Sequence, residues 1–214
     1  MMKILWAYCV VFSAIGLANS AVMIVEYGWE DGATILGNYL PIEALNVSLP
    51  EPVHSGKHSL KLVDGGIDTP QAYVAYITGL SNGDIVSANF YVFDDTPGPG
   101  VSPRARIWAH YVKNNNINDY AGSAGGNLAY SDGSGWCNLS WNWTIDSGYD
   151  RTGLVIEVRT YSNFGDTVWI DDLSVIAPVS SKIYLPGQQI SEPCTVLIAF
   201  GMLIKFLKLR YFIK

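Results

Sequence analysis

Aromatic and polar side chains alternate with apolar ones along three segments, Ile85–Phe93, Ala105–Val112 and Gly153–Tyr161. Because successive side chains of a β-strand point to opposite faces, each segment would turn its apolar set toward a core and its polar set outward. If the three strands share a sheet, one outer face carries Asn89, Tyr91, Arg106, Trp108, His110, Glu157 and Arg159. Flat rings that stack on pyranose faces, beside Arg, Glu and Asn that bond vicinal hydroxyls, suit a sugar. The alternative is an ordinary solvent face, on which Glu157 pairs with Arg159 and a loop covers Trp108.

Other residue types that could support catalysis lack the required spacing. His54 and His58 are four residues apart, a spacing that brings metal ligands together on a helix but not on the strand and loop expected here. The side chains of the doublets Asp94-Asp95 and Asp171-Asp172 diverge on a strand, so neither doublet forms the facing carboxylate pair of glycoside hydrolases. No nearby constellation of His and acid supports Cys137 as a nucleophile, and it fits a strand as a small apolar residue. We therefore expect a protein without catalytic activity.

The elements that would position these residues are short strands. Runs rich in Val, Ile, Tyr, Trp and Thr recur between clusters of Gly, Pro, Asn and Asp, and no long stretch has helical periodicity. About eight antiparallel strands between residues 21 and 178 predict an all-β fold, a two-sheet antiparallel β-sandwich of the jelly-roll type. Residues 179–190 have the composition of a short linker. The predicted strands are Val22–Tyr27, Ser59–Val63, Ala72–Thr78, Ile85–Phe93, Ala105–Val112, Cys137–Ile145, Gly153–Tyr161 and Thr167–Ile176.

Composition excludes some classes of protein. The 214 residues are 49% hydrophobic and 15% charged, which argues against a disordered chain. The formal net charge is -6, and residues 21–190 alone carry 8 basic and 18 acidic side chains. Attraction to the phosphate backbone is the main sequence-independent contribution to nucleic-acid affinity. A nucleic-acid partner is therefore not expected.

The N-terminus has the pattern of an export signal. Residues 1–20 contain Lys3, an apolar run from Ile4 to Leu17 and the small-residue ending Ala18-Asn19-Ser20. This order is typical of a secretory signal peptide cut by signal peptidase after Ser20. A membrane anchor is the alternative, but the run is shorter than the roughly 20 apolar residues that span a bilayer.

The C-terminus, residues 191–214, combines a turn motif, an apolar run and a basic end. Ser191, Glu192 and Pro193 precede Thr195–Ile204, and Lys205, Lys208 and Arg210 follow. This order resembles the PEP-CTERM sorting tail of exported Gram-negative bacterial proteins, with Ser191 in place of the first Pro. The resemblance implies a transmembrane helix, recognition by an exosortase, and delivery to the cell surface or extracellular matrix. A buried C-terminal helix is the alternative.

Three landmarks of the body appear in an order known from one group of sandwiches. They are Glu26–Gly32, which contains Trp29-Glu30-Asp31, the hairpin Val53–Leu62 and the final strand Val168–Val175. In this order they resemble the galactose-binding-like jelly rolls of bacterial carbohydrate-binding modules. The resemblance implies this fold and a carbohydrate partner, without naming the sugar.

The same resemblance implies a structural calcium ion. In that group calcium commonly joins the first strand, the Ser-Gly-Lys loop and the last strand. Carried over to this sequence, its site comprises Glu30, Ser55, Lys57, Asp171 and Asp172. Calcium takes six to eight oxygens, so carboxylates and loop carbonyls suit it. The alternative is that Asp171 accepts hydrogen bonds from loop amides and no metal is present.

Two functional hypotheses remain open at this point. The protein is either a carbohydrate-binding module displayed at the surface, binding an exopolysaccharide or surface glycan, or a structural matrix protein without a specific ligand. A glycan hydrolase with unrecognised catalytic residues is a third and weaker alternative.

Overall fold

The computed structural model describes residues 21–94, 103–133, 135–148, 150–161 and 163–188. These residues form strands and connecting turns, without a helix. Within them there is accordingly no helix long and apolar enough to cross a membrane. The predicted signal peptide, the predicted C-terminal helix and the motif Ser191, Glu192 and Pro193 lie outside the described residues.

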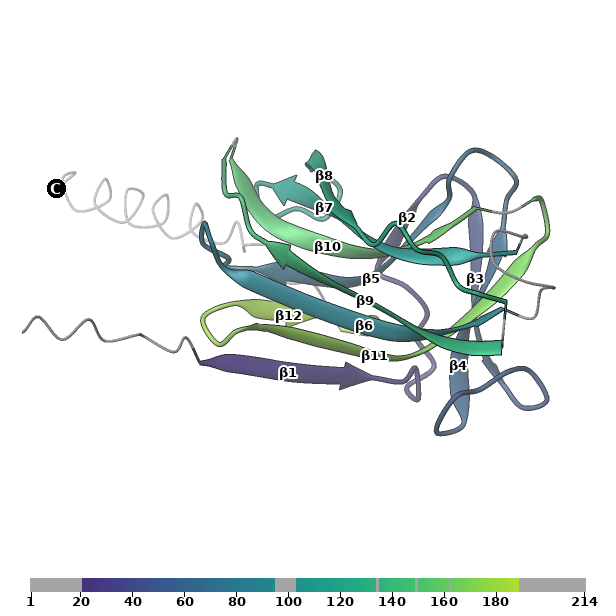
Figure 1. Ribbon diagram of the computed structural model, residues 1–214. Coiled ribbons are helices and arrows are strands. Elements are labelled where there is room, and N and C mark those ends of the chain that lie inside the picture. Colours follow the sequence, from purple (N-terminus) through teal and green to yellow (C-terminus); the bar gives the residue numbers. More distant parts are fainter. Residues whose placement is uncertain (1–20, 95–102, 134, 149, 162, 189–214) are drawn as a thin grey trace, which may run out of the picture.

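Twelve strands make up the described fold (Figure 1). All eight predicted strands are present, with ends that differ from the prediction by at most two residues. Four strands were not predicted: β2, β3, β8 and β12. The strands are β1 (Val22–Tyr27), β2 (Gly37–Tyr39), β3 (Ile42–Ser48), β4 (His58–Asp64), β5 (Gln71–Thr78), β6 (Ile85–Asp94), β7 (Ala105–Lys113), β8 (Tyr120–Gly126), β9 (Gly135–Thr144), β10 (Arg151–Thr160), β11 (Thr167–Pro178) and β12 (Lys182–Tyr184).

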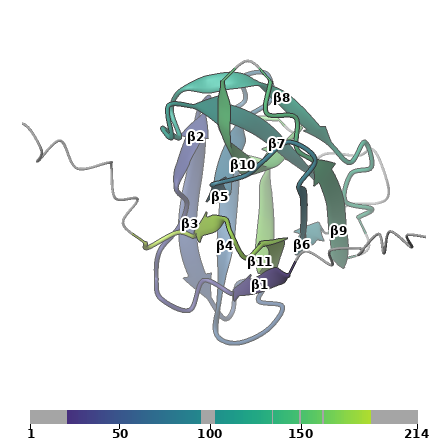
Figure 2. The ribbon, with the colours of Figure 1, turned by 90° about the vertical axis from the view of Figure 1, so that its left-hand side faces the viewer.

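The strands form two antiparallel sheets that pack face to face. Sheet A has the order β3-β4-β11-β6-β9, with β1 paired to β11. Sheet B has the order β12-β5-β10-β7-β8, with β2 paired to β5. Figure 2 shows β7, β8 and β10 on one side of the molecule and β1 and β11 on the other. The predicted two-sheet β-sandwich is confirmed.

The core lies between the sheets and consists of the inward side chains of both. Val86, Ala88, Phe90 and Val92 of β6 are buried there, as the alternation predicts. Ile107 and Ala109 of β7 and Leu154, Ile156 and Val158 of β10 meet them from sheet B. Burial of this apolar area, at about 25 cal/mol per Å², is the main stabilising contribution to the fold.

The predicted linker is wrong over part of its length. Lys182–Tyr184 forms β12, which pairs with Tyr76–Thr78 of β5. Leu185, the next residue, is buried in the core. Ser180-Ser181 and Pro186-Gly187 have the composition of a linker, but they flank a short edge strand. The sandwich therefore continues to Leu185.

Candidate functional site

The seven candidate ligand-binding residues lie on two opposite outer faces, so the premise of one shared face is wrong. Strand β6 pairs with β11 and β9 in sheet A, whereas β7 and β10 pair with each other in sheet B. Asn89 and Tyr91 therefore lie outside sheet A, and the other five residues lie outside sheet B. Alternation correctly predicted which side chains face away from the core. It carries no information about which sheet a strand joins.

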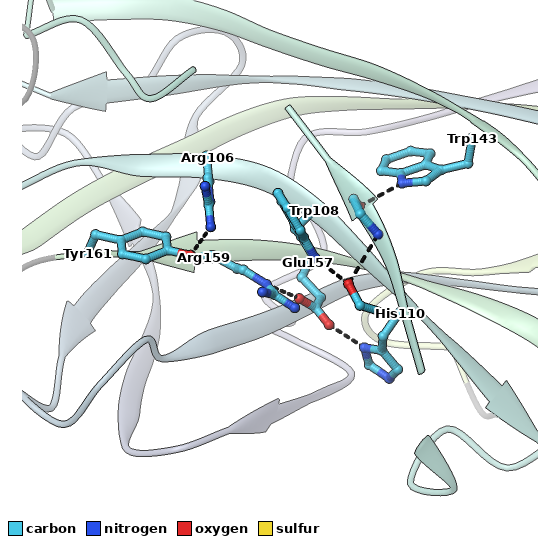
Figure 3. Close-up of polar contacts among 9 residues, drawn as sticks. Arg106, Trp108, His110, Trp143, Glu157, Arg159 and Tyr161 are labelled. Atoms are coloured by element: carbon cyan, nitrogen blue, oxygen red, sulfur yellow. Dashed lines mark hydrogen bonds and ion pairs between the residues drawn. The ribbon is translucent and has the colours of Figure 1, made fainter. Parts of the chain in front are cut away.

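On sheet B the strand register brings the remaining five residues together. Arg159 lies opposite Arg106, and Glu157 lies opposite Trp108, on the neighbouring strands β10 and β7. His110 follows on β7 with its side chain on the same face. Tyr161, just beyond the end of β10, completes a group that we name the Trp108 cluster: Arg106, Trp108, His110, Glu157, Arg159 and Tyr161 (Figure 3).

A buried ion-pair network forms the base of the Trp108 cluster. Glu157 is fully buried, and its Oε1 contacts Nδ1 of His110, which is itself buried. Arg159 donates from Nε to Oε2 of Glu157 at 2.6 Å. The Gln71 amide, oriented to donate, lies 3.2 Å and 3.3 Å from the two carboxylate oxygens. Both oxygens of Glu157 are therefore engaged within the protein. The Glu157–Arg159 pair, which belonged to the alternative of an ordinary solvent face, is present, but within strand β10 and not across two strands.

The indole of Trp108 lies against the edge strand β8. Its Nε1 donates to Oγ of Ser123 at 2.9 Å. Trp108 is paired with Gly126, and a Cβ added to Gly126 would lie 2.9 Å from Cε3 of the indole and 2.4 Å from the carbonyl oxygen of Ile107. Only glycine leaves room for the ring and the backbone at this position.

Two guanidinium groups approach the Trp108 ring. The Cζ atoms of Arg106 and Arg159 lie 4.4 Å and 4.8 Å from its centroid. Arg106 also lies 4.4 Å from the ring centroid of Tyr161, to whose hydroxyl it donates a hydrogen bond, and 5.2 Å from that of Tyr130. Each such cation–π contact is worth about 0.5–2 kcal/mol. Rings and charges are thus held in fixed positions on this face.

The other half of the outer face of sheet B is closed by a second apolar cluster. Tyr73, Tyr76, Val112, Val155 and Tyr184 pack together there, with Leu36 and Ile117 against them. Burial raises the pKa of Tyr73 and of Tyr76 to about 12. The accessible part of the face is therefore the part around Trp108, Arg106 and Tyr161, whose side chains are only partly buried.

On sheet A, Asn89 and Tyr91 line a pocket of about 670 Å³. Tyr91 stacks on the imidazole of His54 with 3.8 Å between ring centroids. Asn138 donates to Asn89 across β9 and β6. The complete lining is Glu26, Tyr27, Gly28, Ser55, Asn89, Tyr91, Asp172, Leu173 and Ser174. Oxygen acceptors predominate in it, and the lining contains no cationic side chain.

A β-bulge in β11 places the two aspartates of the predicted calcium site. Asp171 and Ser174, three residues apart, pair with Tyr91 and Asn89, two residues apart, so β11 contains one extra residue. That residue is Asp172, whose φ is +47°. Its carboxylate accepts from Ser55 Oγ and contacts His54 Nδ1, both at 2.6 Å.

The predicted calcium residues do meet, through hydrogen bonds to loop amides. Oδ2 of Asp171 accepts from the backbone N–H of His54 at 2.9 Å and of Ser55 at 3.1 Å. Burial raises the pKa of Asp171, and these hydrogen bonds oppose the rise. Oε1 of Glu30 accepts from the N–H of Lys57 at 2.8 Å and of His58 at 3.0 Å, which lowers the pKa of Glu30.

This donor set fits a hydrogen-bonded clasp better than it fits calcium, because the loop turns N–H groups toward the carboxylates. Within the described parts of the chain, no group of three or more His, Cys, Asp or Glu is placed to hold a metal ion. The hydrogen bonds from loop amides to Asp171 that the alternative expects are present, and the calcium ion stays a prediction.

Several residues of the Trp108 cluster and its surroundings were not among the predicted site residues. Tyr161 follows the outward alternation of Glu157 and Arg159, so its position could have been inferred from the sequence. Ser123 and Gly126 belong to β8, a strand that was not predicted. Tyr130 lies in a loop after β8, and no sequence signal places it beside Arg106.

No protein-family model matches the sequence, and no curated protein matches it. Solved structures do resemble the fold. The CBM22-1 xylan-binding domain from Paenibacillus barcinonensis Xyn10C is similar over 75% of this chain and 98% of its own, with a TM-score of 0.53 and 15% identity. The CBM22-2 xylan-binding domain of the same protein is similar over 72% and 98%, with a TM-score of 0.51 and 15% identity. At this identity the likeness concerns the fold, which is that of the carbohydrate-binding-module β-sandwiches.

Proposed function

We propose that this protein binds a polysaccharide through the Trp108 cluster and has no catalytic activity of its own. The observation that carries the proposal is the position of Trp108, a partly buried ring fixed against β8 at Ser123 and Gly126 with two guanidinium groups beside it. A fixed aromatic surface next to hydrogen-bond donors is what a pyranose ring needs. The similarity in fold to xylan-binding domains makes xylan the first polysaccharide to test.

The Trp108 cluster is a better candidate than the pocket of sheet A. The rings of the cluster gather around one accessible area. Both sites contain a ring with a protein group against it, since two guanidinium groups approach Trp108 and His54 stacks on Tyr91. The Trp108 cluster differs in offering cationic hydrogen-bond donors, which the lining of the sheet A pocket lacks. Asp172 and Ser55 are engaged in fastening the loop to β11. These two hydrogen-bonding groups of the pocket are thus already bonded within the protein and are not free for a ligand.

The direct test is the affinity of the purified protein for soluble xylan, measured by affinity electrophoresis and calorimetry. Trp108→Ala should weaken binding by about 30-fold or more, because a ring at the centre of a site typically contributes 2 kcal/mol or more. Trp141→Ala is the matched control, since Trp141 is a half-exposed tryptophan on β9 of the other sheet. Equal affinities for the wild type and Trp108→Ala would refute the proposed site. Release of reducing sugar from xylan would refute the non-catalytic assignment.

We place this activity outside the cell, at the surface or in the extracellular matrix, on the strength of the sequence patterns at the two ends of the chain. Signal peptidase, exosortase and, until cleavage, the membrane would be partners during export. Fractionation of cells that express the full chain tests the location. Retention of the uncut chain in the cytoplasm would contradict it.

A further inference from the structure

Arg106 is a cation for which the described part of the chain provides no carboxylate. Its hydrogen bond goes to the neutral hydroxyl of Tyr161, and its Nε is buried without a hydrogen-bond partner. By contrast, Arg159 is paired with Glu157, and Arg151 with Asp146. A partly buried charge without a counter-charge is costly, so its presence requires compensation.

Aromatic rings provide part of this compensation. The rings of Trp108, Tyr161 and Tyr130 surround the Arg106 guanidinium at 4.4 to 5.2 Å. They shield it from water, which strengthens its interaction with any anion that enters the cluster. They cannot neutralise it, because a ring offers a quadrupole and no net charge.

The charges around the cluster favour an anion. The groups that face it from β7 and β10 are Arg106, Arg159, His110 and Glu157, and the single carboxylate is shared by His110 and Arg159. The neighbouring strands β5, β2 and β8 contribute Gln71, Tyr39 and Ser123, which are uncharged. Two guanidinium groups and one carboxylate thus give the cluster a local excess of positive charge, whereas residues 21–190 as a whole carry 8 basic and 18 acidic side chains.

We propose that the polysaccharide bound by the Trp108 cluster is acidic, and that Arg106 receives the carboxylate of a uronic acid residue. This inference rests on the proposed function and specifies its ligand class. A planar guanidinium can pair with a carboxylate through two parallel N–H···O bonds, a geometry that neutral sugars do not offer. The pyranose ring that carries the carboxylate would then lie beside Trp108.

The test compares each polymer with its own carboxyl-reduced form, so that chain length and linkage stay constant. Glucuronoxylan supplies the uronate as a side group, and polygalacturonate supplies it in the main chain. The wild-type protein should bind at least one native polymer about 10-fold or more tighter than the reduced polymer. Arg106→Gln should remove most of that difference, and Arg106→Lys should restore only part of it. Lys182→Gln, the loss of an exposed cation on β12, should leave it unchanged.

The outcomes separate the two proposals. Equal binding of native and reduced polymers would overturn the acidic-ligand inference and leave polysaccharide binding intact. Absence of binding to all four polymers would overturn both. Loss of the preference for the native polymer in Lys182→Gln would show general attraction to polyanions and would also overturn the role of Arg106. If circular dichroism shows that Arg106→Gln is unfolded, the comparison of native with carboxyl-reduced polymers in the wild-type protein tests the acidic-ligand inference by itself.

Discussion

Replacement of Glu157 by Gln tests whether the buried ion-pair network holds the binding face in place. Glu157 is fully buried, between His110 and Arg159. The variant keeps the shape of the side chain but removes its charge. It also turns an N–H₂ group toward donors, where the carboxylate presented only acceptors.

Removal of one partner from a buried ion pair costs about 3–5 kcal/mol, since the other charge stays buried and unpaired. Gln retains one acceptor oxygen, so we expect Glu157→Gln to lower the free energy of unfolding by about 3 kcal/mol, the lower end of this range. For a domain of this size each kcal/mol lowers Tm by about 2–4 °C, so Glu157→Gln should lower it by about 6–12 °C. Domains of this kind have about 5–15 kcal/mol of stability, so the variant should remain folded at 25 °C.

The assay is urea unfolding followed by tryptophan fluorescence, with a double-mutant cycle. Arg159→Gln in the Glu157→Gln background removes the unpaired cation. The double variant should therefore be about 1–3 kcal/mol more stable than the sum of the two single effects predicts. Glu43→Gln, an exposed acid on β3, is the control and should change the free energy of unfolding by less than about 0.5 kcal/mol. A loss below about 1 kcal/mol in Glu157→Gln, or strict additivity with Arg159→Gln, would refute the reasoning.

Two further predictions concern the residues around the two faces. Gly126→Ala places a Cβ 2.4 Å from the carbonyl oxygen of Ile107 and 2.6 Å from Cα of Trp108, so it should cost about 1–3 kcal/mol and also weaken xylan binding. Unchanged urea unfolding and unchanged affinity would contradict the close packing of β8 on Trp108. The lowered pKa of Glu30 means that its contribution to stability is present above its unfolded pKa of about 4.3 and is lost as the pH falls through the folded pKa. Glu30→Gln should therefore lower Tm at pH 7 and approach the wild type in acid; a constant difference at all pH values in calorimetry would argue against the clasp.

The strands that could be predicted are those in which the alternation of apolar and polar residues along the sequence matches the alternation of buried and accessible side chains in the structure. In β6, four alternate apolar residues are buried and their neighbours are less so, and the sequence shows the same alternation. Strands β2 and β12 have three residues each, too few for a period of two to be recognised. Strand β12 also follows Ser180-Ser181 and precedes Pro186-Gly187, a composition typical of a linker. Local sequence therefore determines most strands of six or more residues and leaves the three-residue strands β2 and β12 undetermined.

Membership of a sheet could not be predicted, because it depends on pairings between distant segments. Strand β6 pairs with β11, which begins more than 70 residues later, and β10 pairs with β5 across a similar distance. Either sheet would have satisfied the alternation of β6 equally well. This is why five candidate residues proved to be neighbours while Asn89 and Tyr91 lie on the opposite face.

Strand β8 was missed for a reason that bears on function. Its sequence, Tyr120–Gly126, contains three glycines, and glycine is depleted in strands because it loses much conformational freedom and provides no side chain to pack. In the folded protein the missing side chain at Gly126 is what makes room for the indole of Trp108, and Gly125, with φ of +81°, lies where the register between β7 and β8 shifts. Larger residues would favour the strand conformation and be easier to predict, but at Gly126 a Cβ would collide with the carbonyl oxygen of Ile107 and with Trp108. The weak strand signal of β8 and the fixed position of Trp108 thus have one cause, which is the absence of a Cβ at the edge of sheet B.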